Sequence, residues 1–273
     1  MKKNGFWYTY IHRVKENLPT PEKGNEVIIA YNITDLNNSV LYSKEDLGIK
    51  KYDNNTYLLA DNSNNAIRKL FSDGSVQTFI GGQNSWNNQD GLRENVGIGR
   101  PNGFDVDSQG AIYFVGDENR VKKYDPSTDR ITTIAGNGDW NEIDGKGSLA
   151  SFRGTRDITL GKDGVLYVAD HNNANIRILT PTESGYSVTS MFNSVNDGNI
   201  VTGPVSEAMI GYPEAIEYDS VKNVIYALTN GINLIMIDLN TQMVDSYRLS
   251  DNGNWWQIKD ISLDENGDIY FVN

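Results

Sequence analysis

The chain contains no cysteine, which excludes disulfide bonds, thiolate metal sites and cysteine nucleophiles. It has no apolar run approaching the roughly 18 residues that a membrane-spanning helix needs. The N-terminal stretch MKKNGFWYTYIHR lacks the apolar centre of a signal peptide, so none is expected there. The 273 residues are 38% hydrophobic and 22% charged, which is sufficient for a sizeable hydrophobic core.

Positive charge is scarce and unevenly placed. The net charge is −12, which disfavours binding to a nucleic-acid backbone over any large surface. Residues 1–52 hold eight Lys and Arg against six Asp and Glu, whereas the rest of the chain holds sixteen against thirty. This shift in charge predicts that the N-terminal segment, residues 1–46, is distinct from residues 47–273.

One pattern recurs along most of the chain. Between Arg153 and Phe192 the sequence predicts four short strands, 156–160, 165–170, 176–180 and 187–192, separated by Gly, Asn and Asp. Similar stretches begin at Leu47, Pro101 and Pro213, and a half-copy runs from Ile258 to Asn273. The residues that close the second strand of each copy fall 56, 53, 60 and 43 residues apart. Four strands at this period are typical of propeller blades. The prediction is an all-β propeller with five four-stranded blades.

Two of the copies resemble NHL repeats. They are PNGFDVD followed by IYFVGD in residues 101–117, and LYVAD with NN and IR in residues 166–177. The linkers TFIGG…DG and TIAGNG…DGKG are similar to those of bacterial NHL propellers. The resemblance covers about residues 47–273 and implies an NHL-type propeller. Six blades are usual for that family, so the alternative of a six-bladed propeller is kept. The resemblance also favours an extracytoplasmic location, but it does not imply an activity.

The N-terminal residues 5–52 resemble the opening strands of FKBP-type domains, particularly the gliding-motility-associated lipoprotein branch. The resemblance rests on GFWY at 5–8, VIIAY at 27–31 and VLYS at 40–43. Tyr31 matches a pocket tyrosine of that family, but Tyr42 stands where many members carry aspartate. The helix and later strands of the family are missing, so a prolyl-isomerase site cannot be complete.

A second interpretation of the N-terminal segment concerns ring closure. Residues 27–46 have the same pattern of apolar and polar residues as the third and fourth strands of the copy that begins at Pro213. Residues 258–273 supply only two strands. Propellers avoid exposed edges by combining strands from the two termini. We therefore expect residues 258–273 and 27–44 to share one blade, with residues 5–18 as an additional strand or arm. An independent half-domain would leave its edges open.

The connections between successive copies are long, whereas the other predicted turns are short. They span 81–100, 136–153, 193–212 and 250–257, and strand alternation places them all at one end of the propeller. Long loops tend to carry function. Four of the five tryptophans lie in these connections: Trp86, Trp140, Trp255 and Trp256. Their rings either form a binding platform or pack against the propeller.

The start of each first strand is expected to line the mouth of the central channel. Cations there suggest an anionic or carboxylate-bearing ligand, although salt bridges between blades are the alternative. The predicted ligand-binding residues are Trp255, Trp256, Arg153, Arg156, Asn102, Glu214, Tyr212 and Lys259.

The sequence predicts no catalytic residue, metal ligand or cofactor. Some NHL-like propellers are zinc lyases, which need several imidazoles, but the chain has only His12 and His171. Asp61, Asp117 and Asp170 repeat around the ring and are expected to be structural. The predicted function is non-catalytic recognition of a peptide, protein or glycan. The alternatives are a lyase or hydrolase with a carboxylate-bound divalent cation at the channel mouth, and a recombinant or designed joining of two families without evolved function.

Overall fold

The computed structural model describes residues 2–3, 6–14, 27–31, 48–73, 75–82, 89–193, 198–249, 260–263, 267 and 269–272. For residues 2–31 and 270–272 only the backbone is described. This part of the chain is built from strands, with short 3₁₀ turns and no α-helix. No helix in the described part could therefore span a membrane.

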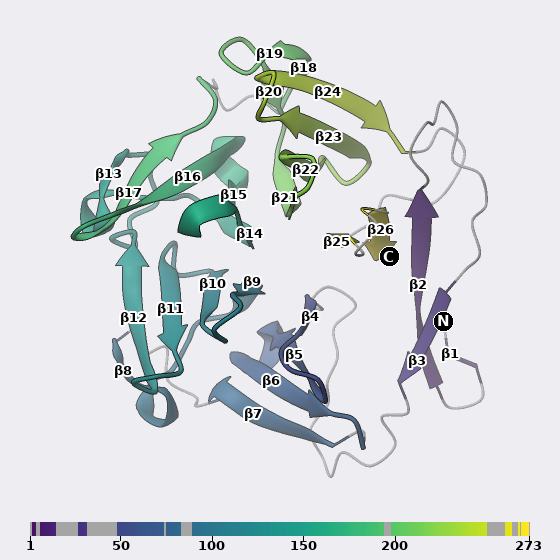
Figure 1. Ribbon diagram of the computed structural model, residues 1–273, viewed down its shortest axis with the longest axis vertical. Coiled ribbons are helices and arrows are strands. Elements are labelled where there is room, and N and C mark those ends of the chain that lie inside the picture. Colours follow the sequence, from purple (N-terminus) through teal and green to yellow (C-terminus); the bar gives the residue numbers. More distant parts are fainter. Residues whose placement is uncertain are drawn as a thin grey trace.

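Four antiparallel sheets follow the predicted repeats, and in each sheet consecutive strands pair with one another (Figure 1). The strands predicted between residues 156 and 192 are confirmed to within two residues at each end. The sheets contain β4 (Ile49–Lys51), β5 (Thr56–Asp61), β6 (Ala66–Phe71) and β7 (Val76–Gly81); β9 (Pro101–Val106), β10 (Ile112–Gly116), β11 (Val121–Asp125) and β12 (Arg130–Ala135); β14 (Thr155–Leu160), β15 (Leu166–Asp170), β16 (Asn175–Thr182) and β17 (Gly185–Ser190); and β21 (Pro213–Asp219), β22 (Val224–Thr229), β23 (Asn233–Asp238) and β24 (Met243–Arg248).

A further sheet contains strands from both ends of the sequence. It consists of β25 (Asp260–Leu263), β26 (Ile269–Val272), β2 (Phe6–Val14), β3 (Val27–Tyr31) and β1 (Lys2–Lys3). The strand that pairs with β26 is β2, in the register Ile11 opposite Val272, and β3 pairs with β2. Residues 27–31 and the C-terminal strands therefore belong to one sheet, as expected, and residues 6–14 form the additional strand that lies between them. Residues 32–44 lie outside the described residues.

The core lies between neighbouring sheets, because the second strand of a sheet is apolar on both faces. In β10, Ile112 and Phe114 pack with residues of β5 and β6, whereas Tyr113 and Val115 pack with residues of β14 and β15. All four side chains are buried, which explains why IYFV reads as a continuous apolar run rather than as an alternating pattern. Figure 1 shows the sheets arranged around a common centre, with β4, β9, β14, β21 and β25 innermost.

The long connections have a structural role that their length alone did not reveal. Each of three contributes a two-residue strand to the outer edge of the next sheet: β8 (Gly91–Leu92) pairs with β12, β13 (Gly145–Lys146) with β17, and β19 (Gly203–Pro204) with β24. Each connection then returns apolar side chains to the core, as with the buried Ile98, Phe152 and Ile210. The connections therefore cover exposed sheet edges. Their length is no evidence of function by itself.

Candidate functional site

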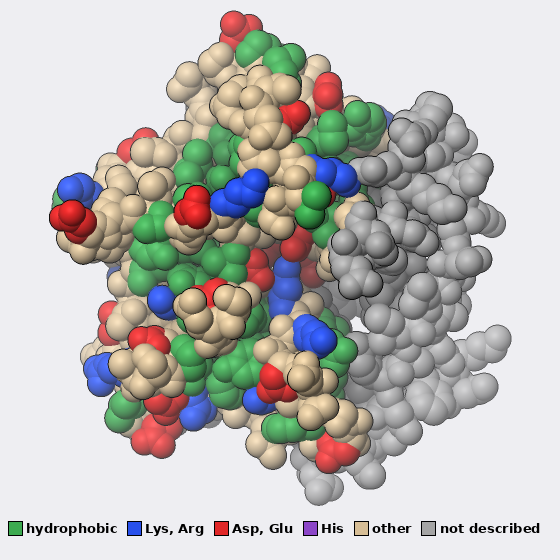
Figure 2. Space-filling model, viewed as in Figure 1, with side chains coloured by type: hydrophobic (Ala, Val, Ile, Leu, Met, Phe, Trp, Pro, Cys, Tyr) green, Lys and Arg blue, Asp and Glu red, His purple; other side chains and the backbone are tan. Residues whose placement is uncertain are grey.

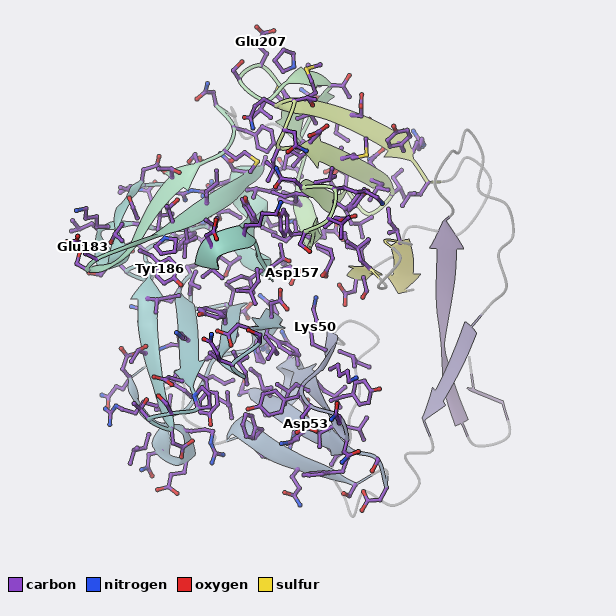
Figure 3. The ribbon with its side chains drawn as sticks, viewed as in Figure 1. Lys50, Asp53, Asp157, Glu183, Tyr186 and Glu207 are labelled. Atoms are coloured by element: carbon purple, nitrogen blue, oxygen red, sulfur yellow. The ribbon has the colours of Figure 1, made fainter. Side chains whose placement is uncertain are left out.

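The centre of the propeller carries one charged side chain from each innermost strand. These residues are Lys50 on β4, Asp105 on β9, Asp157 on β14, Glu217 on β21 and Asp260 on β25. Lys50 Nζ donates a hydrogen bond to Glu217 Oε2 at 2.7 Å and lies 3.9 Å from Asp105 Oδ1. Figure 2 shows basic and acidic side chains side by side at the centre of this face, and Figure 3 shows Lys50 and Asp157 near the centre, between the sheets. We call these five residues the axial cluster, in which one ammonium group is surrounded by four carboxyl groups.

Backbone donors of neighbouring sheets hold the carboxylates of the axial cluster. Asp157 Oδ2 accepts a hydrogen bond of 2.8 Å from the Ile216 amide on β21. Asp105 Oδ2 accepts one of 2.8 Å from the Leu160 amide on β14. The two Asp side chains therefore join β9 to β14 and β14 to β21, which is a structural use of these groups.

Charge imbalance and burial shift the pKa values of this cluster. Burial, opposed by the nearby Lys50, raises the pKa of Glu217 to about 7. Burial raises the pKa of Asp260 to about 6, and burial together with the charge of Asp260 raises the pKa of Asp157 well above its usual range. Burial alone would lower the pKa of Lys50, but the surrounding carboxylates raise it. A single ammonium group cannot neutralise four carboxylates, so the cluster retains protons near neutral pH.

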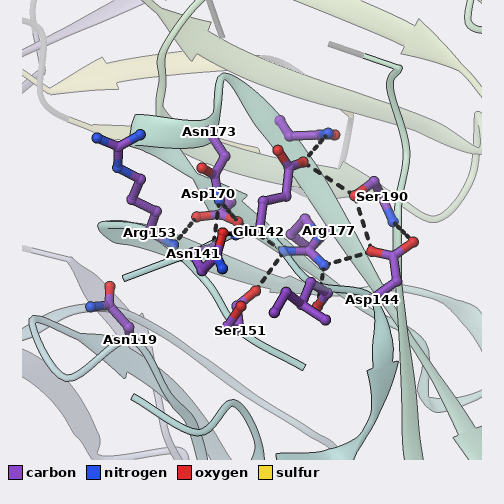
Figure 4. A network of polar contacts seen from close by, with 12 residues as sticks. Asn119, Asn141, Glu142, Asp144, Ser151, Arg153, Asp170, Asn173, Arg177 and Ser190 are labelled. Atoms are coloured by element: carbon purple, nitrogen blue, oxygen red, sulfur yellow. Dashed lines mark hydrogen bonds and ion pairs between the residues drawn. The ribbon is translucent and has the colours of Figure 1, made fainter. Parts of the chain in front are cut away.

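Arg153 and Trp140 lie together in the connection that precedes β14. The guanidinium carbon of Arg153 is 5.9 Å from the centroid of the Trp140 ring, and Trp140 is 58% exposed. The Arg153 amide donates to Asp170 Oδ1 at 2.7 Å, whereas its buried Nε has no hydrogen-bond partner among the described residues. In Figure 4 the guanidinium points away from the surrounding polar network.

Arg156 and Tyr212 lie on either side of His171. Arg156 is exposed on β14, and its positive charge adds to the effect of burial in lowering the pKa of His171. His171 Nδ1 is 3.1 Å from the Pro213 carbonyl, and the His171 ring centroid is 5.5 Å from that of Tyr212. Arg153, Arg156 and Tyr212 are thus grouped near the turn that follows β15. The site residues predicted from the sequence included neither Trp140 nor His171.

The remaining predicted site residues are Asn102 and Glu214, which are described, and Trp255, Trp256 and Lys259, which are not. Asn102 accepts a hydrogen bond from Asn62 and donates to the Thr155 carbonyl at 2.8 Å, so it connects neighbouring sheets. Glu214 is half-buried at the start of β21. The predictions for Trp255, Trp256 and Lys259, and for the loop residue Trp86, concern positions outside the described residues.

Asp170 belongs to a structural network rather than to the mouth (Figure 4). Its Oδ2 accepts hydrogen bonds from Asn173 at 2.8 Å and from the fully buried Arg177 at 3.1 Å. Arg177 also pairs with Asp144 at 2.6 Å. These contacts agree with the structural role predicted for the repeated aspartates. Within the described part of the chain, no three His, Cys, Asp or Glu side chains converge to form a metal site.

Comparison with known proteins supports the repeat assignment. No protein-family model matches the chain. Human NHL repeat-containing protein 2 is 30% identical over 157 residues, which are 54% of this chain and 21% of that protein. The chain therefore spans about a fifth of this relative's length, and the similarity supports an NHL-repeat region.

Solved structures support the fold alone. A catalytically inactive virginiamycin B lyase from Staphylococcus aureus, solved with quinupristin, gives a TM-score of 0.56 at 15% identity, over 99% of this chain and 80% of that one. An auxiliary nutrient binding protein from Bacteroides thetaiotaomicron gives 0.53 at 12% identity, over 84% of this chain and 69% of that one. The protein is therefore an all-β propeller with a region that is similar to NHL-repeat proteins. The FKBP-like character of residues 5–52 stays a prediction.

Proposed function

We propose that the protein is a non-catalytic recognition propeller that binds a peptide, protein or glycan at the mouth formed by Trp140, Arg153, Arg156, His171 and Tyr212. The observation that carries the proposal is the exposed Trp140 ring beside an arginine whose guanidinium group has no acidic partner among the described residues. Exposed tryptophan and arginine are the residue types that most often anchor a ligand.

The polar groups at the axis favour binding over catalysis. The axial carboxylates accept hydrogen bonds from the backbone of neighbouring sheets, and Lys50 already places a cation among them. The alternative of a lyase or hydrolase needs carboxylates that are free to hold a divalent cation. The auxiliary nutrient binding protein shows that a propeller of this kind is compatible with binding, although at 12% identity it supports the fold only.

Binding at the mouth can be tested on peptide and glycan arrays. Trp140→Ala should weaken binding of any captured ligand by about 2 kcal/mol, or roughly thirtyfold, because a central stacking anchor is removed. Tyr247→Ala is the matched control, since Tyr247 is 46% exposed on the outer strand β24. Trp255→Ala and Trp256→Ala, proposed to act at the same face, belong in the same series. Equal binding by wild type and Trp140→Ala would refute the proposed site.

We also propose that the propeller has five blades and that residues 1–46 close the ring. The antiparallel pairing of β2 with β26 supports this proposal. Deleting residues 1–46 should abolish cooperative unfolding, because β26 would lose its partner and expose an edge. Deletion of residues 1–4, which leaves β2 intact, is the control. Unchanged melting of the longer deletion would show that the N-terminal segment is an appendage.

A further inference from the structure

We infer that Arg153 and Trp140 form a subsite for a carboxylate that is attached to a flat or apolar group. This inference rests on the proposed function and names the ligand chemistry for the same mouth. The guanidinium group would bind the carboxylate, and the Trp140 ring would stack against the rest of the ligand.

Neither Arg153 nor Arg156 forms an ion pair with a described residue, although acidic side chains are abundant in a molecule with a net charge of −12. Arg120 and Arg130 form none either, but Arg153 is distinguished by its buried Nε without a hydrogen-bond partner and by the exposed Trp140 ring beside it. Cations paired elsewhere are Arg68 with Asp61, Arg93 with Asp129, Arg177 with Asp144 and Asp170, and Lys122 with Asp90.

The backbone around the subsite is fixed before any ligand binds. The Arg153 amide donates a hydrogen bond of 2.7 Å to the Asp170 carboxylate, and the Arg153 carbonyl accepts a hydrogen bond of 3.0 Å from the Asn172 amide. Trp140 forms a β-bridge to Phe152, the residue that precedes Arg153. The guanidinium group and the indole ring are therefore held on adjacent backbone segments, which reduces the entropy lost on binding.

The chemistry of the site favours a carboxylate over other anions. A guanidinium group presents two parallel N–H donors that match the two oxygens of a carboxylate. A phosphate monoester can accept hydrogen bonds from the same two N–H donors, but it carries more negative charge, which the strongly acidic protein repels. An exposed indole adds stacking area for a ring or an aliphatic group beside the carboxylate.

Three small probes of one shape test this inference: benzoate, its neutral amide benzamide, and phenyl phosphate. Binding is followed on the full chain by the NMR signals of the tryptophan indoles and arginine side chains, with Trp140→Phe and Arg153→Gln used to assign them. We expect benzoate to bind with millimolar affinity, at least about tenfold more tightly than benzamide or phenyl phosphate. Added salt should weaken benzoate binding and leave benzamide unaffected.

Arg153→Gln should weaken benzoate binding about tenfold, and Arg153→Lys should recover only part of it because lysine lacks the planar fork. Arg130→Gln is the matched control, since Arg130 is exposed on β12 away from the mouth. The melting temperature of each variant establishes that it folds. Benzoate affinity unchanged in a folded Arg153→Gln variant would overturn the inference.

The outcomes separate this inference from the proposed function. Equal affinities for benzoate and benzamide, both dependent on Trp140, would overturn the carboxylate subsite and leave recognition at the mouth intact. Tighter binding of phenyl phosphate would overturn it in favour of a phosphate. If none of the probes shifts the Trp140 or Arg153 signals, the subsite is refuted, and Trp140→Ala on the arrays decides the proposed function separately.

Discussion

The axial cluster should make the protein most stable in mildly acidic solution. The folded protein holds Glu217 with a pKa of about 7, whereas an unfolded chain gives glutamate a pKa of 4.5. A carboxyl group with a raised folded-state pKa binds its proton more tightly in the folded state. Its contribution to stability is therefore fully present below about pH 4.5 and is lost as pH rises through about 7.

The size of the effect follows from this difference in pKa. Glu217 keeps only 17% of its side-chain exposure, so screening by water is limited, and its shift corresponds to about 3 kcal/mol. Asp157 and Asp260 act in the same direction, but the contributions do not add, since each proton bound reduces the repulsion on the others. For a domain of this size, about 3 kcal/mol corresponds to a melting temperature roughly 6–12 °C lower at pH 8 than at pH 5.

Other groups oppose this trend at lower pH and set the position of the maximum. The hydrogen bond from Arg93 lowers the pKa of Asp129, so its contribution is present above about pH 4 and is lost on acidification. Burial lowers the pKa of His171, and its contribution likewise declines as pH falls below its usual value of 6.5. Stability should therefore peak near pH 5 and fall on both sides.

The measurement is thermal or urea unfolding of wild type and Glu217→Gln from pH 4.5 to 8.5, followed by circular dichroism. Glutamine resembles the protonated glutamic acid, so the variant should match wild type near pH 5 and exceed it by about 3 kcal/mol at pH 8. The difference between the two proteins cancels the contribution of His171. A variant that is less stable than wild type at pH 8, or that has the same pH dependence, would refute this account of the cluster.

Three further variants test the packing around the axis by urea unfolding. Lys50→Met should lower the free energy of unfolding by up to about 3–5 kcal/mol at pH 8, and by less at pH 5, because it leaves the carboxylates without a cation. A loss of stability that does not depend on pH would contradict this. Gly103→Ala should destabilise strongly because its Cβ would lie 2.6 Å from the Cα of Asp157 on the next sheet, whereas Gly48→Ala meets only a side-chain carbon at 3.7 Å and should be mild. Arg177→Met should lower the free energy of unfolding by about 3–5 kcal/mol, since it leaves the buried Asp170 carboxylate without a cation. A smaller loss would show that water takes the place of the guanidinium group.

The blades could be predicted from the sequence because each is a local unit. Strands of four to six residues separated by turn residues form hairpins between neighbours in the chain, so the pattern contains the information for the pairing. The order of β26, β2 and β3 could not be predicted in the same way. It joins segments from the two ends of the sequence, and residues 27–31 and 6–14 both have the composition of a strand.

The candidate site was only partly visible in the sequence. Arg153, Arg156 and Tyr212 were predicted because they begin blades, whereas β8, β13 and β19 show that the long connections also serve to cover sheet edges. A signal for the axial cluster was present, because every copy carries a charged residue in its first strand. Only the structure shows that these side chains meet, because the distances between blades are set by packing.

The unpaired state of Arg153 is related to the spacing between Asp170 and Arg177. Arg177 follows Asp170 by seven residues and reaches its carboxylate, so that carboxylate is occupied from within its own blade. In the preceding blade, Lys122 follows Asp117 by only five residues and pairs with Asp90 instead. The Asp117 carboxylate there lies 3.9 Å from the guanidinium group of Arg100. The position of one basic residue in the third strand thus decides whether the aspartate at the end of the second strand is taken from within the blade. Where it is taken, as in the blade of Asp170, the preceding arginine stays available to a ligand.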